Sequence, residues 1–401
     1  MNKQSLITIL LAILLSMTGA KALAHDIEAP NADGVTIYYN WIKNKTELEV
    51  SYRGSSSTSY DNEYIGNVVI PSTVVYQGST YKVTSIGYCA FEECIYLTSV
   101  SIPNSVKSIG TKAFLNCNEI TKITIGKGVA SIGEYAFCGC SILKSISLPN
   151  NITAISSYAF QNCKALTSFV IPNSVTSIGR YAFSGANRLN SIFIPDNVTS
   201  IGDGAFSGCI KIGYIVLGKS VKNINDGSFA QCKELSSVYC LAENVPTTNK
   251  DAFYGSGIDE VSLRVPEASL NKYSNTVPWK NFGRKRALDV STIPVMPTCA
   301  KPAISLVDGK IQFSCETEGV DYISEVTVSD DNTYFDDNIA TPTKFEVSVY
   351  ATKTGYINSE TATAEFNISN DIIMSGDVNN DGKVNVADHV KLSEIIMNQK
   401  E

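Results

Sequence analysis

Residues 83–105 read VTSIGYCAFEECIYLTSVSIPNS, and this pattern returns every 23 residues until Leu263. The phenylalanine of the pattern marks the period, because it occurs at Phe91, Phe114, Phe137, Phe160, Phe183, Phe206 and Phe229, and again at Phe253 after one extra residue. A fixed period of this length predicts a solenoid, in which each unit forms one turn of a coil and packs against its neighbours.

Each unit is expected to contribute one short strand. Leu97, Val100 and Ile102 are spaced to point inward, with the Thr and Ser between them outside. About eight such rungs build a parallel sheet roughly 35 Å long, and the rest of each unit closes the coil behind it. The L-x-x-I-x-I core with this period is typical of leucine-rich repeats. The repeat glycines, at positions 87, 110, 133, 179 and 202, are expected to give a tight turn its conformational freedom.

The fold class is therefore mainly β, a leucine-rich-repeat solenoid followed by a small β-sandwich and a C-terminal loop and helix of EF-hand type. The expected divisions are 1–24 signal peptide, 25–82 N-terminal cap strands, 83–266 solenoid, 267–298 C-terminal cap and linker, 299–370 sandwich, and 371–401 calcium loop and helix.

The first residues predict export. Lys3 precedes an apolar run from Leu6 to Met17, and Ala22-Leu23-Ala24 gives a small-x-small cleavage site before His25. No later stretch has the roughly 18 consecutive apolar residues that a membrane-spanning helix needs. The mature chain is expected to be secreted or to lie at the cell surface.

The chain has 11 cysteines, and most occupy one repeat position. The cysteines at 94, 117, 140, 163, 209 and 232, with Ala186 substituting once, predict a buried thiol column rather than disulfides. Cys299 and Cys315 lie outside the repeats and are the better disulfide pair, although the sequence leaves that pairing open.

Charge divides the chain. Residues 299–401 carry 18 acids against 7 bases, whereas residues 83–266 carry 12 acids against 14 bases. The acidic C-terminal part argues against nucleic acid and anionic membranes as partners. The alternative is that this acidic segment serves only as a solubilising spacer.

A metal site is predicted near the C-terminus, within the segment DVNNDGKVNVAD at 377–388. Oxygen ligands fall at EF-hand positions 1, 3, 5 and 12, a carbonyl is available at position 7, and Gly382 permits the sharp turn. We expect a single Ca²⁺ held by Asp377, Asn379, Asp381, the Lys383 carbonyl and Asp388.

The repeat unit I-G-x-x-A-F-x-x-C-x-x-L-x-S-I-x-I-P resembles the BspA-type leucine-rich repeats of bacterial surface proteins. That resemblance implies a secreted or surface adhesin that binds host matrix proteins, host cells or other bacteria. Residues 299–319 resemble the immunoglobulin-like modules found in chitobiase-like enzymes and in surface proteins of gut bacteroidetes, which implies a spacer.

The calcium loop resembles one half of a type I dockerin, a module that docks onto cohesin-bearing scaffolds. Two departures weaken that transfer, since the chain ends after one loop-helix half and loop positions 10 and 11 are Val386 and Ala387. A cohesin-like scaffold is therefore a secondary partner hypothesis.

The binding face is expected on the outward side of the strands. The central outward column is predicted to run Ser101, Thr124, Ser147, Val170, Phe193, Val216, Tyr239 and Ser262, with Tyr214 in the next column. The apolar members Val170, Phe193, Tyr214, Val216 and Tyr239 predict an exposed patch for a protein or glycan ligand. The alternative is that neighbouring side chains cover the patch.

Catalysis is not expected. The repeats contain no histidine, His25 and His389 flank them, and only Asp259 and Glu260 offer adjacent outward acids. Three function classes remain: a protein-binding adhesin, a glycan-capturing module, and an accessory subunit of an extracellular polysaccharide-degrading assembly held through its C-terminus.

Overall fold

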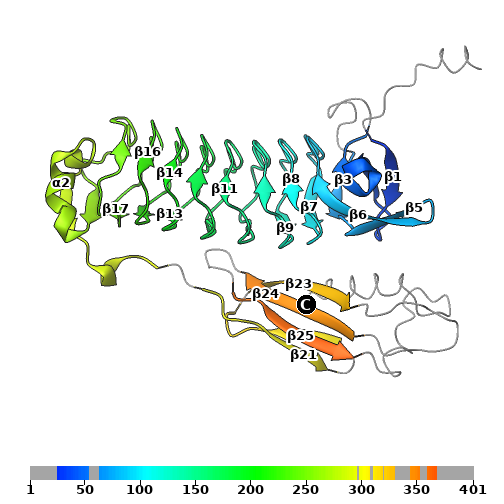
Figure 1. Cartoon of the computed structure of the whole chain (residues 1–401). Helices are drawn as coiled ribbons and strands as arrows, with labels where there is room; N and C mark the ends of the chain where they lie inside the picture. The colour runs from blue at the N-terminus through cyan, green and yellow to red at the C-terminus, as the bar shows by residue number, and fades with distance from the viewer. Residues whose placement is uncertain are drawn as a thin grey trace, which may run out of the picture. The chain divides into compact units, whose positions relative to one another are not determined.

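The structure, a computed structural model, describes residues 25–53, 63–295, 298–307, 310–318, 320–329, 344–352 and 359–367. The chain divides into two compact units at Ile293, and each unit is described by itself. The first unit is an elongated coil of short strands (Figure 1). The mainly β solenoid predicted from the 23-residue period is confirmed.

Strands account for nearly all of the regular structure in the described residues. Those of the first unit are β1 (Ile27–Pro30), β2 (Thr36–Ile42), β3 (Glu47–Ser51), β4 (Gly66–Val69), β5 (Thr73–Tyr76), β6 (Ser79–Ile86), β7 (Leu97–Ile102), β8 (Ser108–Ile109), β9 (Lys122–Ile125), β10 (Ser131–Ile132), β11 (Ala154–Ile155), β12 (Ser177–Ile178), β13 (Ser191–Ile194), β14 (Ser200–Ile201), β15 (Tyr214–Leu217), β16 (Asn223–Ile224), β17 (Ser237–Cys240), β18 (Thr247–Thr248), β19 (Ser262–Val265) and β20 (Arg284–Ala287). Short helices lie at α2 (Leu270–Asn275) and, with 3₁₀ geometry, at Lys43–Lys45, Glu267–Ser269, Trp279–Asn281 and Val290–Thr292.

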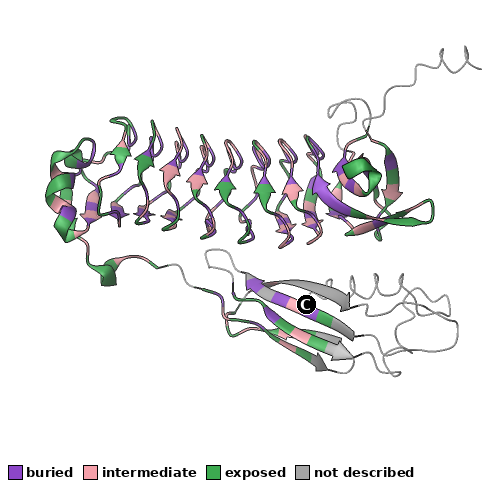
Figure 2. Cartoon of the chain, in the orientation of Figure 1, coloured by how far each residue is buried: buried purple, intermediate pink, exposed green. Residues whose placement is uncertain are grey.

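The turns of the coil build two parallel ladders rather than one. The predicted strands form the sheets β4-β7-β9 and β13-β15-β17-β19-β20, which we call the strand face. The two residues at the Ser-Ile position of the repeat form the second ladder. In it β8 and β10 extend the N-terminal sheet, and β11-β12-β14-β16-β18 form a separate parallel sheet. The inward residues of each rung are buried, as predicted for Leu97, Val100 and Ile102, and most of the outward ones are half-buried or exposed. The alternation of burial along the coil can be followed in Figure 2.

The phenylalanines of successive rungs stack in one column through the core, which we call the phenylalanine column. From Phe91 to Phe253, neighbouring rings lie 4.8 to 5.4 Å apart with interplanar angles of 2° to 14°. This separation is close to the spacing between paired strands, so the ladder holds the rings in stacking contact. Phe169 packs edge-on against both Phe160 and Phe183.

The thiol column predicted from the repeat is confirmed, and its members are hydrogen-bond donors. From Cys117 onward, each thiol donates to the carbonyl oxygen of the phenylalanine one rung earlier, as Cys117 does to Phe91 at 2.9 Å and Cys163 to Phe137 at 3.2 Å. The same bond is made by Cys140, Cys209 and Cys232. In the last rung Ser256 takes the place of cysteine and donates to Phe229 at 2.7 Å.

The repeat glycines serve close packing rather than turn geometry, so the predicted reason for them is wrong. A Cβ on Gly110 would lie 2.6 Å from the carbonyl carbon of Gly87, and one on Gly133 would lie 2.4 Å from the nitrogen of Thr111. Left-handed backbone occurs instead two positions later in each repeat, with φ of 51° to 60° at Cys89, Lys112, Tyr135, Tyr158, Tyr181, Gly204 and Gly227.

The N-terminal cap closes the phenylalanine column with a tyrosine. The buried Tyr64 ring lies 4.5 Å from that of Phe91, and its hydroxyl donates to the Ser51 carbonyl at 2.9 Å. Strand β3 runs parallel to β6, so the cap sheet continues directly into the second ladder.

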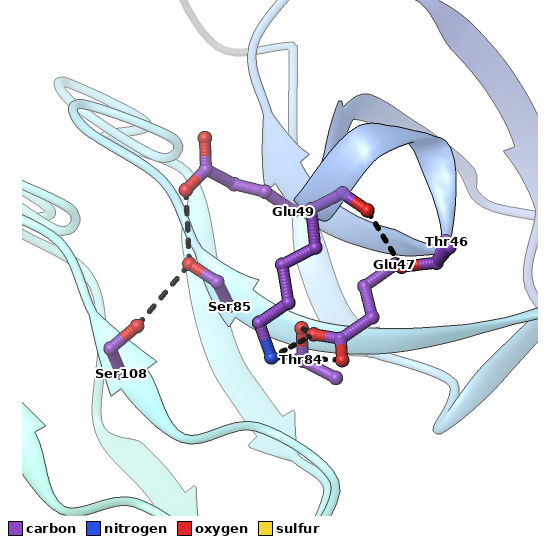
Figure 3. A network of polar contacts seen from close by, with 7 residues as sticks. Thr46, Glu47, Glu49, Thr84, Ser85 and Ser108 are labelled. Atoms are coloured by element: carbon purple, nitrogen blue, oxygen red, sulfur yellow. Dashed lines mark hydrogen bonds and ion pairs between the residues drawn. The ribbon is translucent and has the colours of Figure 1, made fainter.

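Two carboxylates of β3 fix the cap to the first rung (Figure 3). Ser85 donates to Glu49 at 2.9 Å and receives a hydrogen bond from Ser108 at 3.3 Å, while Thr84 donates to Glu47. Lys43 forms an ion pair with Glu47 at 2.8 Å. Hydrogen bonds from Lys43 and Thr84 lower the pKa of Glu47, which keeps this carboxylate charged.

At the other end, Trp279 and Phe282 cover Phe253 edge-on, at 5.8 and 5.2 Å. The buried Tyr273 packs on Trp279 and donates to the Ala242 carbonyl at 2.7 Å. These are the bulky residues that the sequence places where the period stops. Strand β20 then adds one further strand to the strand face.

The second unit contains two antiparallel sheets in its described residues. One pairs β21 (Ala303–Val307) with β22 (Lys310–Ser314), and the other has the order β23 (Asp321–Ser329), β24 (Lys344–Thr352), β25 (Ala362–Asn367). No disulfide joins Cys299 to Cys315, and the Cys315 thiol donates to the Ala300 carbonyl at 3.1 Å. The pairing that the sequence left open is thus not formed in this structure.

Replacement of Cys163 tests whether the thiol column acts through its hydrogen bonds. Cys163→Ser keeps the donor that Ser256 already supplies in the last rung, so it should cost less than Cys163→Ala, which loses both the bond and buried volume, at about 1–3 kcal/mol of unfolding free energy. Chemical denaturation of both variants measures the difference. Equal losses would mean that packing alone matters.

Glu63 is expected to make stability depend on pH. Burial raises the pKa of its carboxyl to about 7, from 4.5. The folded state thus binds the proton more tightly than the unfolded state, so stability is highest below pH 4.5 and falls as pH rises toward 7.

Glu63→Gln removes this titration but keeps an acceptor for the Arg53 amide, which donates to Glu63 at 2.7 Å. The variant should gain about 1 kcal/mol over the wild type between pH 4.5 and pH 8, a value reduced for partial exposure of the carboxyl. Melting curves of both proteins across this range measure it. A constant difference would contradict the assignment.

Candidate functional site

The strand face brings together four of the five predicted ligand-binding residues. Phe193 of β13 is paired with Val216 of β15, which is paired with Tyr239 of β17, and Tyr214 precedes Val216 by two residues on β15. Val170 occupies the same column one rung earlier, where no strand is assigned.

These residues are less exposed than the sequence predicts. Val216 and Tyr239 are buried, with 5% and 8% of their surface accessible, and Val170, Phe193 and Tyr214 are half-buried. An exposed position is therefore wrong for Val216 and Tyr239. The alternative, that neighbouring side chains cover part of the patch, holds at these two residues.

The covering groups are the ring and guanidinium groups of the face itself. Phe193 and Tyr214 meet edge-on with ring centroids 5.7 Å apart. The Arg264 guanidinium carbon lies 5.5 Å from the centre of the Tyr239 ring, within cation–π range. The aromatic cluster thus packs on itself, and its accessible part is formed by Phe193 and Tyr214.

The last rung has a different register from the one predicted. Ser262 pairs with Ser237, and the residue beside Tyr239 is Arg264, so the predicted outward column ends at Arg264 rather than at Ser262. The last repeat is two residues longer than the others, because Ser237 pairs with Ser262 and not with the residue 23 positions later. A shift of two keeps the same side chains outward, whereas a shift of one would have turned them inward.

Strand β20 adds charged residues that the sequence pattern did not reveal. Arg284 pairs with Ser262 and Arg286 with Arg264, and both arginines are exposed. No repeat continues into this segment, and Arg284, Lys285 and Arg286 show no alternation of apolar and polar residues that would have indicated a strand. The strand face therefore changes along its length from Ser and Thr, through an aromatic cluster, to three arginines.

The remaining predicted sites do not add to this face. The calcium ligands Asp377, Asn379, Asp381, Lys383 and Asp388 lie outside the described residues, as does the predicted signal peptide. Within the described ranges, no three His, Cys, Asp or Glu side chains gather as a metal-binding group. Asp259 and Glu260 are exposed in the turn before β19.

Five cysteines of the column are held as unreactive thiols. Burial raises the pKa of Cys117, Cys140, Cys163 and Cys209 well above the usual value and that of Cys232 to about 12. A thiol reacts as its thiolate, so these groups stay unreactive while the protein is folded. No helix in the described part of the chain has the length and apolar character to cross a bilayer.

Comparison with known proteins identifies the repeats. The family model described as "BspA type Leucine rich repeat region" matches residues 56–169 and 153–276. No curated protein matches the sequence.

Several solved structures are similar. A leucine-rich cell surface protein from Faecalibacterium prausnitzii is 20% identical, with 66% of this chain and 95% of that chain covered and a TM-score of 0.37. A leucine-rich repeat protein from Bacteroides ovatus is 22% identical, with 63% and 75% covered and a TM-score of 0.36. The T. pallidum leucine-rich repeat protein is 24% identical, with 53% and 86% covered and a TM-score of 0.35.

Proposed function

Since the chain belongs to the family of proteins with BspA-type leucine-rich repeats, we propose that it is a secreted or cell-surface adhesin without catalytic activity. Its ligands are host matrix, cell-surface or bacterial proteins or glycans, and it binds them through the strand face. Repeat proteins of this architecture expose an extended surface whose outward residues vary while the core repeats.

The observation that carries the proposal is the aromatic cluster on an otherwise Ser- and Thr-rich face. Phe193 and Tyr214 stay half-exposed on adjacent strands although the fold does not need them outward, since Ser147 and Ser191 occupy equivalent positions. Aromatic side chains held rigidly at the surface are the residue types enriched in binding hot spots. Tyr239 supports the cluster from its buried position.

The test is binding of the mature chain to a panel of matrix proteins, mucins and polysaccharides. Phe193→Ser combined with Tyr214→Ser should weaken binding at least about tenfold, since hot-spot aromatics each contribute on the order of 2 kcal/mol. Surface plasmon resonance measures the dissociation constants.

The matched control is Tyr88→Ser combined with Tyr254→Ser. These tyrosines are 57% and 68% exposed and lie in turns off the strand face, so binding should be unchanged. Equal loss in both double variants, with melting temperatures retained, would place the binding site elsewhere.

We also propose that residues 377–388 bind one Ca²⁺, on the basis of their EF-hand ligand pattern. Calorimetry of the mature chain should give one calcium per chain, and Asp377→Ala should weaken binding at least about tenfold because it removes the first ligand of the loop. Asp371→Ala removes the same charge just outside the loop and should leave binding intact. Unchanged affinity in Asp377→Ala would exclude this loop as the site.

Retention in an extracellular assembly through a cohesin-like scaffold is the secondary hypothesis. It rests on the same loop and requires that chelation of Ca²⁺ release the chain from its scaffold while ligand binding by the repeats persists. Pull-down with the Asp377→Ala variant distinguishes it from simple calcium binding.

A further inference from the structure

Three arginines lie at the C-terminal end of the strand face, and their charge indicates which class of ligand this face binds. This inference rests on the proposed function. We propose that Arg264, Arg284 and Arg286 form a binding site for an anionic polysaccharide that carries sulfate or carboxylate groups.

The sheet register places the three side chains together. Arg264 of β19 and Arg286 of β20 are direct partners across the parallel pair, and Arg284 precedes Arg286 by two residues on the same side of β20. Lys285, between them, points elsewhere, because its amine donates to the carbonyls of Lys280 and Phe282. Neighbouring strands lie about 4.8 Å apart, so the guanidinium groups can bind adjacent anionic groups of one chain.

Without a bound ligand, the close placement of the three arginines is electrostatically unfavourable. Like charges directly opposite each other on neighbouring strands destabilise a sheet. Among the ion pairs of the described residues, none involves these arginines. Asp289 lies within electrostatic range, but hydrogen bonds from Ser291 and then the charge of Arg264 lower its pKa, and its carboxylate already accepts from the Ser291 amide and hydroxyl. No ion pair of the described residues therefore neutralises any of the three positive charges.

Arg264 is held in place before any ligand arrives. Its guanidinium lies over the Tyr239 ring and donates to the Thr292 hydroxyl at 3.2 Å. Its Nε is buried without a hydrogen-bond partner in the described structure. A guanidinium fixed by stacking loses less side-chain entropy when it binds an anion, so the site is pre-organised at Arg264.

Protection of a sheet edge does not explain the cluster. Charged residues on an edge strand discourage pairing with other chains, and Arg284 and Arg286 can serve that purpose on β20. Arg264, however, lies on an inner strand that is paired on both sides. Edge protection therefore accounts for two of the three charges and not for their alignment with the third.

The surroundings favour a polysaccharide over an acidic peptide. The outward residues beside the arginines are Ser262, opposite Arg284, and Ser237, opposite Ser262. The Tyr239 ring is buried beneath Arg264, so it offers no open apolar surface to anchor a peptide side chain. Hydroxyl and guanidinium groups on an open sheet match the hydroxyl and acidic groups of a linear anionic glycan.

The test compares binding of the mature chain to dextran sulfate, a polyuronate, neutral dextran and polyglutamate, at low ionic strength and at about 0.15 M salt. The wild type should bind one or both anionic polysaccharides and not dextran. Arg284→Ser with Arg286→Ser should weaken this binding at least about tenfold, because charge-assisted hydrogen bonds are lost at both positions. Arg284→Lys with Arg286→Lys should recover only part of it, since lysine keeps the charge without the planar fork.

The matched control is Lys222→Ser with Lys233→Ser. Both lysines are exposed and lie outside the strand face, so the charge loss is equal and binding should change by less than about twofold. The inference is overturned if the wild type binds neither polyanion, if the control loses as much as the arginine variant, or if polyglutamate binds as tightly as both polysaccharides. Dextran sulfate and the polyuronate separate sulfate from carboxylate recognition.

Failure here is distinguishable from failure of the proposed function. If a ligand of the matrix panel is lost with Phe193→Ser and Tyr214→Ser but is unaffected by the arginine variant, the adhesin function stands and the anionic-glycan assignment falls.

Discussion

Stacking of one phenylalanine per rung is the interaction on which the rest of this structure depends. The ladder spacing brings each ring into contact with the next, so no rung buries its own apolar surface without a neighbour. The terminal rings of the phenylalanine column have no further phenylalanine to cover them, and different residues cover each end. Tyr64 closes one end, and Trp279 and Phe282 close the other.

The period and the inward pattern of the repeat were sufficient to predict the solenoid, its core and the thiol column, because side-chain spacing directly determines which residues are buried. The second ladder was not predicted, since two residues such as Ser108 and Ile109 are too few to show strand alternation. The glycine column was recognised for the wrong reason. A recurring glycine in the sequence indicates that no side chain fits at that position. It does not indicate whether the backbone conformation or the close approach of a neighbouring rung is the reason.

The candidate site was predictable in position and not in exposure. The period predicts that Phe193, Tyr214, Val216 and Tyr239 face outward. It does not predict that Tyr239 is covered, because the covering residue is Arg264, whereas the fixed period places Ser262 beside Tyr239. A two-residue lengthening of the last repeat is invisible to a fixed period. The arginines of β20 lie beyond the repeats altogether, so the most strongly charged part of the face emerged only from the strand pairing.

The thiol column makes correct folding of each chain depend on when its cysteines become buried. In the folded chain, every thiol of the column that donates to a phenylalanine carbonyl is buried and protonated. In the unfolded chain the same groups are exposed, with ordinary acidity, and any two of them can be oxidised to a disulfide that no rung can accommodate. In an oxidising compartment, folding and oxidation therefore compete, and the order of these two events decides whether a copy matures. The coil protects its cysteines only after it has closed over them, so rapid local assembly of neighbouring rungs has a chemical as well as a structural value.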